Sequence, residues 1–223
     1  MSAKLLLQAI IKFLAGVVMV GALIFLPAWS FAYVEGWIFM GILFIPMFVA
    51  GIVMMFKSPD LLKSRLSAKE TEKEQKLVIG LSLLMFIGAF VVAGLNFRFK
   101  WLGMPFWSVI LAACIFIAAY IFYAEVLREN AYLSRTIEVQ EGQKVVDTGL
   151  YGVVRHPMYM VTLVLFLSMP FVLGSLFSFF IMLVYIPIIV VRIINEEKFL
   201  EKELKGYTEY KKKVKYRLIP FIW

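Results

Sequence analysis

Two short polar motifs in the C-terminal third of the chain contain the residue types that most readily take part in chemistry. One is Arg-His-Pro-x-Tyr at residues 155–159, and the other is Arg-x-x-x-Glu-Glu at residues 192–197. A guanidinium can hold a carboxylate or phosphate through two parallel hydrogen bonds. A carboxylate accepts hydrogen bonds from amino or ribose groups, whereas His and Tyr donate, accept or stack. Together these residues suit the binding of a polar ligand and of an anionic group beside it.

Each of these side chains also has a plainer use in a membrane protein. Arg155 suits the positive boundary of a span, Pro157 the first turn of a helix, and Tyr159 an aromatic belt. Arg192 and Glu196 are spaced to neutralise one another on a helix. Arg192 nevertheless directly follows a run of 35 uncharged residues. An ionisable residue in that position is a functional candidate by default.

The composition indicates that an integral membrane protein positions these motifs. Of the 223 residues, 62% are hydrophobic and only 17% are charged, against roughly 25% charged in a typical soluble domain. A soluble fold of this length cannot bury so much apolar surface. The single cysteine, Cys114, and the single histidine, His156, exclude an internal disulfide, a cysteine-based zinc site and a His-rich metal centre. We therefore expect no metal site.

Uncharged runs predict where the chain crosses the membrane. Each of the first four is 21 to 24 residues long, and a crossing needs roughly 20. The fifth has 35 residues and as one helix would be about 52 Å long, well beyond a hydrocarbon core of about 30 Å. The five runs are Phe13–Val34, Gly36–Phe56, Leu77–Phe97, Trp101–Ala124 and Pro157–Val191.

The long fifth run is predicted to fold as a hairpin of two helices. Pro170 and the pair Gly174-Ser175 lie near its middle, where a helix breaks most easily. The expected fold is therefore an all-α membrane protein with about six transmembrane helices. Because a hairpin returns both of its ends to one membrane face, residues 155–159 and 192–197 should lie close together.

Positive charge alternates between the loops and predicts the orientation. The loop from Lys57 to Lys76 carries six Lys and Arg residues, the segment from Arg128 to Arg155 four, and the tail from Lys198 to Arg217 eight. The loop around 27–35 and the hairpin turn carry none. This alternation predicts that both termini and the polar motifs face the cytoplasm. We divide the chain into a four-helix transmembrane region, 1–127, and a C-terminal catalytic region, 128–223.

Two further C-terminal segments are predicted to surround the motifs. Residues 138–151 contain two glycines and read as a loop or short strand. The tail, 196–223, has an apolar stripe with Lys and Glu opposite it, although Gly206 interrupts the pattern. We expect a cytosolic amphipathic helix that lies on the membrane or covers a cytosolic pocket. The stripe consists of Phe199, Leu200, Leu204, Tyr207, Tyr210 and Val214.

These pieces, taken in order, resemble the isoprenylcysteine carboxyl methyltransferases and the related phospholipid methyltransferases. The resemblance extends from about Gln143 to the C-terminus: G-L-Y-G-V-V-R-H-P-M-Y, the hairpin, R-I-I-N-E-E-K-F-L, and G-Y-T-E-Y-K-K-K-V-K-Y-R-L-I-P. It implies a cytosol-facing pocket for S-adenosyl-L-methionine and a tunnel that admits a lipid substrate from the bilayer. The family often has a histidine where this chain has Gln143.

The resemblance also implies roles for individual residues. Arg192 would face the substrate as the catalytic residue, and Glu196 would bind the cofactor, while the match leaves Glu197 as either a binding or a supporting residue. A carboxylate acceptor is already ionised at neutral pH and needs a cation to hold it, whereas an amine or thiol acceptor must also lose a proton. The remaining cofactor-binding residues would be Gln143, Lys144, Val145, Val146, Tyr151, His156, Pro157, Met158 and Tyr159.

Two other functions remain open on the sequence. The ending V-x-Y-R-x-I-P, Val214–Pro220, is similar to that of membrane NADPH-dependent reductases of sterol-like substrates. A small non-enzymatic transporter or scaffold is the third candidate, although the polar residues gather at one face and not at mid-membrane. The expected partners are a lipophilic or prenylated substrate and membrane lipid. We expect no nucleic acid and no obligate protein partner.

Overall fold

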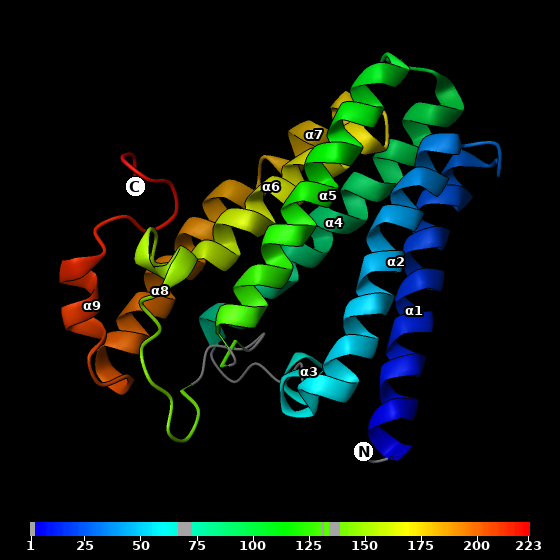
Figure 1. The fold of residues 1–223 in the computed structure, drawn as a ribbon. Coiled ribbons are helices and arrows are strands. Elements are labelled where there is room, and N and C mark those ends of the chain that lie inside the picture. The colour runs from blue at the N-terminus through cyan, green and yellow to red at the C-terminus, as the bar shows by residue number, and fades with distance from the viewer. Residues whose placement is uncertain (1–2, 67–72, 131, 134–138) are drawn as a thin grey trace.

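The protein is an integral, multi-pass, all-helical membrane protein (Figure 1). The computed structural model describes residues 3–66, 73–130, 132–133 and 139–223. Within these ranges the chain forms nine α-helices, one short 3-10 helix and no strand. Five helical segments are long and apolar enough to cross a membrane, and α6 is a shorter apolar helix. The predicted all-α membrane fold is therefore confirmed.

The N-terminal region contains the first four spanning helices, α1 (Ala3–Ala28), α2 (Val34–Lys57), α4 (Lys73–Phe99) and α5 (Phe106–Glu129). The prediction for the first span was wrong at both ends, because α1 begins ten residues before Phe13 and ends six before Val34. A lysine near a helix end extends its amine out of the apolar layer, so it does not stop the helix. Accordingly Lys12 lies within α1, and its amine reaches out to donate to the carbonyl of Leu66, 2.5 Å away.

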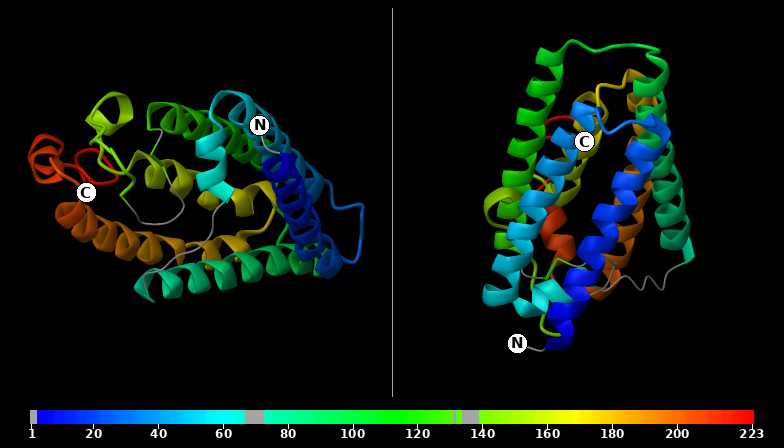
Figure 2. Two further views of the ribbon diagram at one scale, coloured as in Figure 1. Left: turned by 90° about the horizontal axis from the view of Figure 1, so that it is seen from below. Right: turned by 90° about the vertical axis from the view of Figure 1, so that its right-hand side faces the viewer.

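Leu66 is the last residue of the short helix α3 (Pro59–Leu66), which follows α2 at the same end of the bundle as the N-terminus (Figure 1). The connection from α3 to α4 lies outside the described residues, as do parts of the predicted loop Lys57–Lys76. The loops from α1 to α2 and from α4 to α5 lie at the opposite end of the bundle (Figures 1 and 2). The helices thus alternate in direction, as the charge pattern requires.

The predicted hairpin is confirmed, and its turn falls at the glycine. Helix α6 (Pro157–Val172) ends just before Gly174, which has φ +64°, and Ser175 then caps α7 (Leu176–Met182) by accepting a hydrogen bond from Ser178. Pro170 lies inside α6 and does not end it. The returning arm is itself two helices, because α8 (Tyr185–Glu203) starts anew after two residues. Pro187, in the first turn of α8, needs no hydrogen-bond partner for its nitrogen there.

The tail does not form one continuous amphipathic helix, and this prediction is corrected. Gly206 adopts φ +90°, so α8 ends at Glu203 and the short helix α9 (Tyr207–Lys213) takes a new direction. The apolar stripe is nevertheless real. Leu204, Tyr207, Tyr210 and Val214 are buried together against Leu200, Val139 and Val145. The stripe therefore packs on the segment before the 3-10 helix η1 (Gly149–Gly152).

One close helix contact fixes the N-terminal bundle. A Cβ atom on Gly94 of α4 would lie 2.5 Å from the Ile24 carbonyl oxygen and 3.1 Å from Cβ of Pro27 in α1. A Cβ atom essentially never lies 2.5 Å from a backbone oxygen, so α1 and α4 must shift apart if the residue is enlarged. Small residues at helix interfaces in membranes allow backbones to approach in this way.

We expect Gly94→Ala to lower the free energy of unfolding by about 1–3 kcal/mol, the usual cost of overpacking. Thermal unfolding of the purified protein in detergent measures this. The matched control is Gly80→Ala in the same helix, where a Cβ meets nothing within 4 Å. Because alanine favours helix more than glycine does, the control should unfold at the same or a higher temperature. Equal losses in both variants would contradict the close-contact argument.

Candidate functional site

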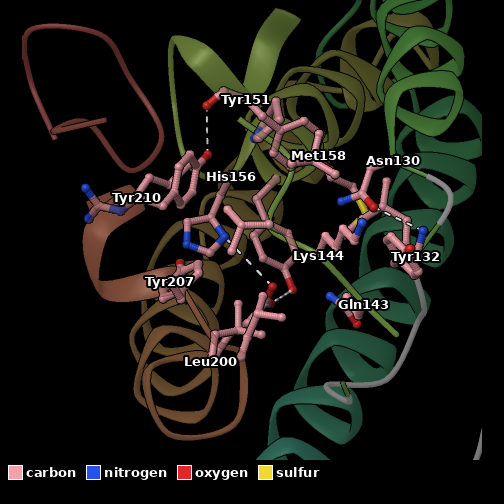
Figure 3. Close-up of a pocket in the computed structure, with 18 of the residues that line it drawn as sticks. Asn130, Tyr132, Gln143, Lys144, Tyr151, His156, Met158, Leu200, Tyr207 and Tyr210 are labelled. Atoms are coloured by element: carbon pink, nitrogen blue, oxygen red, sulfur yellow. Dashed lines mark hydrogen bonds and ion pairs between the residues drawn. The ribbon is translucent and has the colours of Figure 1, made fainter. Parts of the chain in front are cut away.

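A pocket that opens to solvent and encloses a cavity of about 100 Å³ lies where the hairpin's two ends meet α9 (Figure 3). Its walls come from the segment 139–148, η1, the start of α6, the end of α8, and α9. The structure places all eleven predicted site residues around this one pocket, although their roles stay predictions. They are Gln143, Lys144, Val145, Val146, Tyr151, His156, Pro157, Met158, Tyr159, Arg192 and Glu196.

The two motifs meet through a hydrogen-bonded cluster within the pocket. The Tyr159 hydroxyl donates to a carboxylate oxygen of Glu196 and accepts from Nε of Arg192, 2.9 Å away. The guanidinium carbon of Arg192 also lies 5.9 Å from the centre of the Tyr159 ring. The His156 ring stacks on Tyr159 with centroids 5.7 Å apart, and its Nδ1 is 3.9 Å from Glu196. Residues about 40 positions apart therefore act as one cluster.

Glu197 lies behind the pocket wall and organises its support. Its side chain is 3% exposed, and one oxygen accepts from Nε of Arg155 at 2.7 Å and lies 3.3 Å from Nε2 of His156. The other oxygen accepts from Nε of Arg217 at 2.9 Å, and the Lys211 amine is 3.7 Å away. Since Glu197 does not line the pocket, the structure assigns it the supporting position that the sequence left undecided.

The C-terminal segment holds the first motif in place. The backbone nitrogens of Arg155 and His156 donate to the carbonyls of Tyr216 and Arg217, each at 2.9 Å. The Arg155 guanidinium adds bonds to the carbonyls of Val214 and Lys215, at 2.7 and 2.8 Å. Arg155 is thus a buried structural residue, and not only a positive boundary of the span. Residues 214–217, which we call the C-terminal strap, fix the backbone at His156.

The chain brings further residues to the pocket that the motif argument did not assign. Leu200, Leu204, Tyr207 and Tyr210 belong to the apolar stripe, whose periodicity predicted a pocket cover as one of two options. A second group follows α5, where no sequence signal marked it. The full set of additional lining residues is Asn130, Tyr132, Leu133, Arg155, Leu200, Leu204, Tyr207 and Tyr210.

The pocket has both a polar and an apolar side. Glu196, Lys144, His156 and Tyr159 offer charges and hydrogen bonds, whereas valine, leucine and methionine side chains offer flat apolar contact. A second hollow, at the opposite end of the bundle, is lined by residues such as Trp29, and none of the motif residues lies there. Among the described residues, no three His, Cys, Asp or Glu side chains are grouped as a metal site requires.

Fold and site together define a multi-pass membrane protein with a polar pocket where its C-terminal hairpin emerges. The family model for phospholipid methyltransferases matches residues 107–206, from the start of α5 to the turn before α9. All eleven predicted site residues lie in this range. The resemblance to the family that includes the isoprenylcysteine-type membrane methyltransferases is thereby confirmed for the hairpin region.

One curated relative is named as a reductase and not as a methyltransferase. The Delta(14)-sterol reductase TM7SF2 of Mus musculus is 29% identical over an alignment of 135 residues, and the match covers 55% of this chain and 32% of the relative. The chain therefore spans about a third of the length of this relative. Of the two comparisons, the family match favours methyl transfer over reduction.

Proposed function

We propose that the protein is a membrane-embedded methyltransferase that uses S-adenosyl-L-methionine and modifies a lipophilic acceptor. The observation that carries this proposal is the convergence of two motifs, about 40 residues apart, on one pocket inside the segment that matches the methyltransferase family. When bound, the cofactor supplies a methyl group activated by a sulfonium. The protein then has to align the acceptor with that methyl group and exclude water.

The pocket residues suit this cofactor in chemistry. Ligand sites usually combine apolar walls with a few polar groups. Glu196, with a side chain 21% exposed, is available to accept hydrogen bonds from amino or ribose groups. Val145, Met158 and Leu200 offer apolar surface for a purine ring. Tyr159 and His156 hold Glu196 in place and restrict its rotation.

Arg192 is proposed to hold the acceptor. It is placed on the spanning segment Leu176–Glu203 and also lines the pocket, so it lies between the apolar layer and the cofactor side. A carboxylate that reaches this point is already ionised and needs orientation more than proton removal. We therefore propose a carboxylate of the isoprenylcysteine type, or another lipophilic acceptor, as the substrate.

The pocket and both termini are proposed to face the cytoplasm. The support is the density of Lys and Arg at this end, eight of them in the tail from Lys198 to Arg217. Cytoplasmic loops carry such an excess, whereas loops on the other side do not. A lipophilic substrate would then enter from the membrane and the cofactor from the cytosol.

Replacing Glu196 by glutamine tests the cofactor assignment. We expect cofactor affinity to fall at least about tenfold, since a hydrogen bond to a charged group contributes roughly 1.5–3 kcal/mol. Calorimetric titration of S-adenosylhomocysteine into detergent-purified protein gives the affinity. The matched control is Glu209→Gln, an exposed carboxylate on α9 outside the pocket. Unchanged affinity in Glu196→Gln would remove Glu196 from the cofactor site.

A membrane reductase that uses NADPH is the second candidate, favoured by the sterol reductase relative. It differs from the first in the cofactor that the pocket accepts. Oxidation of NADPH on addition of a sterol or enone, without any binding of S-adenosylhomocysteine, would support the reductase.

A further inference from the structure

We propose that Tyr207 is a ligand-binding residue of this pocket, and that its hydroxyl donates a hydrogen bond to an acceptor atom of the bound cofactor. The inference rests on the proposed function, because it takes the pocket's ligand to be S-adenosyl-L-methionine. It assigns a direct contact to α9, which begins just beyond the family-matched residues 107–206.

The carrying observation is a buried hydroxyl without a partner. Tyr207 lines the pocket and is only 4% exposed. Within the described part of the chain its hydroxyl oxygen is buried and has no hydrogen-bond partner. Figure 3 places the Tyr207 ring beside His156, on the side of the pocket formed by α9. Buried polar atoms in proteins are almost always paired, so an unpaired one indicates a missing partner.

Among the described side chains, the hydroxyl of Tyr151, which also lines the pocket, is the other buried one without a partner. The neighbouring Tyr210 differs from both. Tyr210, three residues after Tyr207 on the same helix, donates its hydroxyl to the backbone carbonyl of Tyr151 at 2.7 Å (Figure 3). The rings of Tyr207 and Tyr210 belong to the buried cluster formed with Leu204 and Val214. The cluster therefore fixes both rings, and only one of the two hydroxyls is satisfied by the protein.

The electrostatic surroundings make Tyr207 a donor. Burial, with the charges of Glu197 and Glu196 nearby, raises the pKa of the Tyr207 hydroxyl above its ordinary value, so it keeps its proton. A protonated phenol can donate a hydrogen bond to an oxygen or ring nitrogen of a ligand. S-adenosyl-L-methionine presents such acceptors in its carboxylate, its ribose and its purine.

The backbone turn at Gly206 sets the position of the Tyr207 ring, and a ring in a fixed position is suited to binding a ligand. Gly206, at φ +90°, turns the chain between α8 and α9 and places Tyr207 at the start of the new helix. Leu204, just before the turn, is buried in the same cluster. The ring is thus held in the pocket wall before any ligand arrives, which lowers the entropy lost on binding.

The test is Tyr207→Phe in the full chain, which removes one oxygen and keeps the ring. We expect affinity for S-adenosylhomocysteine to fall about tenfold, as calorimetry measures it. In the ligand-free protein the melting temperature should stay the same or rise, because an unpaired buried hydroxyl is removed. Tyr210→Phe, which loses a paired hydroxyl, should instead lower the melting temperature of the ligand-free protein.

Adenosine, titrated in parallel, tells which part of the ligand accepts the bond. A loss of affinity for both ligands puts the acceptor in the adenosyl part, and a loss for S-adenosylhomocysteine alone puts it in the amino-acid part. Either result supports the role of Tyr207. Unchanged affinity for both ligands in Tyr207→Phe overturns the inference and leaves the methyltransferase proposal intact.

Two further results would also overturn it. A lower melting temperature of ligand-free Tyr207→Phe with wild-type affinity would mean that the hydroxyl is bonded within the protein or to water. Failure of the wild-type protein to bind S-adenosylhomocysteine at all would overturn the proposed function, and the inference with it.

Discussion

Replacing Arg192 by alanine should lower the rate of methyl transfer by about a hundredfold to a thousandfold, the usual effect of removing a charge-stabilising group from an active site. Arg192 belongs to the spanning segment Leu176–Glu203 and lines the pocket, and its Nε donates to the Tyr159 hydroxyl. The variant loses both the cation for the acceptor and one bond that orients Tyr159. Transfer of a radiolabelled methyl group to a prenylcysteine analogue, measured in detergent or nanodiscs, gives the rate.

Two variants separate this role from a general effect of charge. Arg192→Lys keeps the charge but loses the planar fork, so it should recover only part of the rate. Arg128→Ala removes an exposed arginine that pairs with Glu125 outside the pocket, and should leave the rate near that of wild type. Cofactor affinity should change far less than the rate in Arg192→Ala. Full methyl-transfer activity in Arg192→Ala would show that Arg192 does not hold the acceptor.

Replacing Glu197 by glutamine should lower the free energy of unfolding by about 3–5 kcal/mol, as the removal of one partner from a buried ion pair does. Glu197 is buried and joins Arg155 and Arg217 to His156. Glutamine keeps the shape but leaves two buried or half-buried guanidinium groups without their carboxylate. Thermal or chemical unfolding of the purified protein measures the loss.

The matched control is Glu201→Gln, four residues further along α8. Its side chain is 38% exposed and pairs with Lys211, and exposed pairs contribute only about 0–1 kcal/mol. Cofactor affinity should also fall in Glu197→Gln, because the backbone at His156 loses the fixed support of Arg155. Equal stability of the two variants would contradict the supporting role of Glu197.

The hairpin and the meeting of the two motifs could be predicted from sequence alone. A run of 35 uncharged residues is too long for one crossing, and Gly174 marks the turn. Once the hairpin is accepted, residues 155–159 and 192–197 must approach one another. The physical constraint is the thickness of the membrane, which applies to any chain and needs no tertiary information.

Other features depend on tertiary contacts that no local pattern reveals. The sequence does not distinguish Glu196, which lines the pocket, from Glu197, which lies behind it, because the two are adjacent on one helix. Their difference arises from Arg155 and Arg217, which approach Glu197 from distant positions. The position of the C-terminal strap could not be predicted either. Backbone hydrogen bonds join it to the first motif, and such bonds do not depend on which side chains are present.

In the tail, the single residue Gly206 makes the structure differ from the one helix that the apolar spacing predicts. The apolar spacing from Leu200 to Val214 indicated a buried face, and those side chains are indeed buried or half-buried. The single helix expected from that spacing is broken at Gly206, because glycine adopts the left-handed conformation without steric cost. The resulting turn brings α9 over the pocket.

Calorimetric titration of the detergent-purified wild-type protein with S-adenosylhomocysteine and, separately, with NADPH tests the central claim most directly. The account predicts saturable binding of S-adenosylhomocysteine at one site per chain and no binding of NADPH. Binding of NADPH alone would contradict the methyltransferase proposal and assign the pocket to a reductase, and binding of neither would contradict both enzymatic functions.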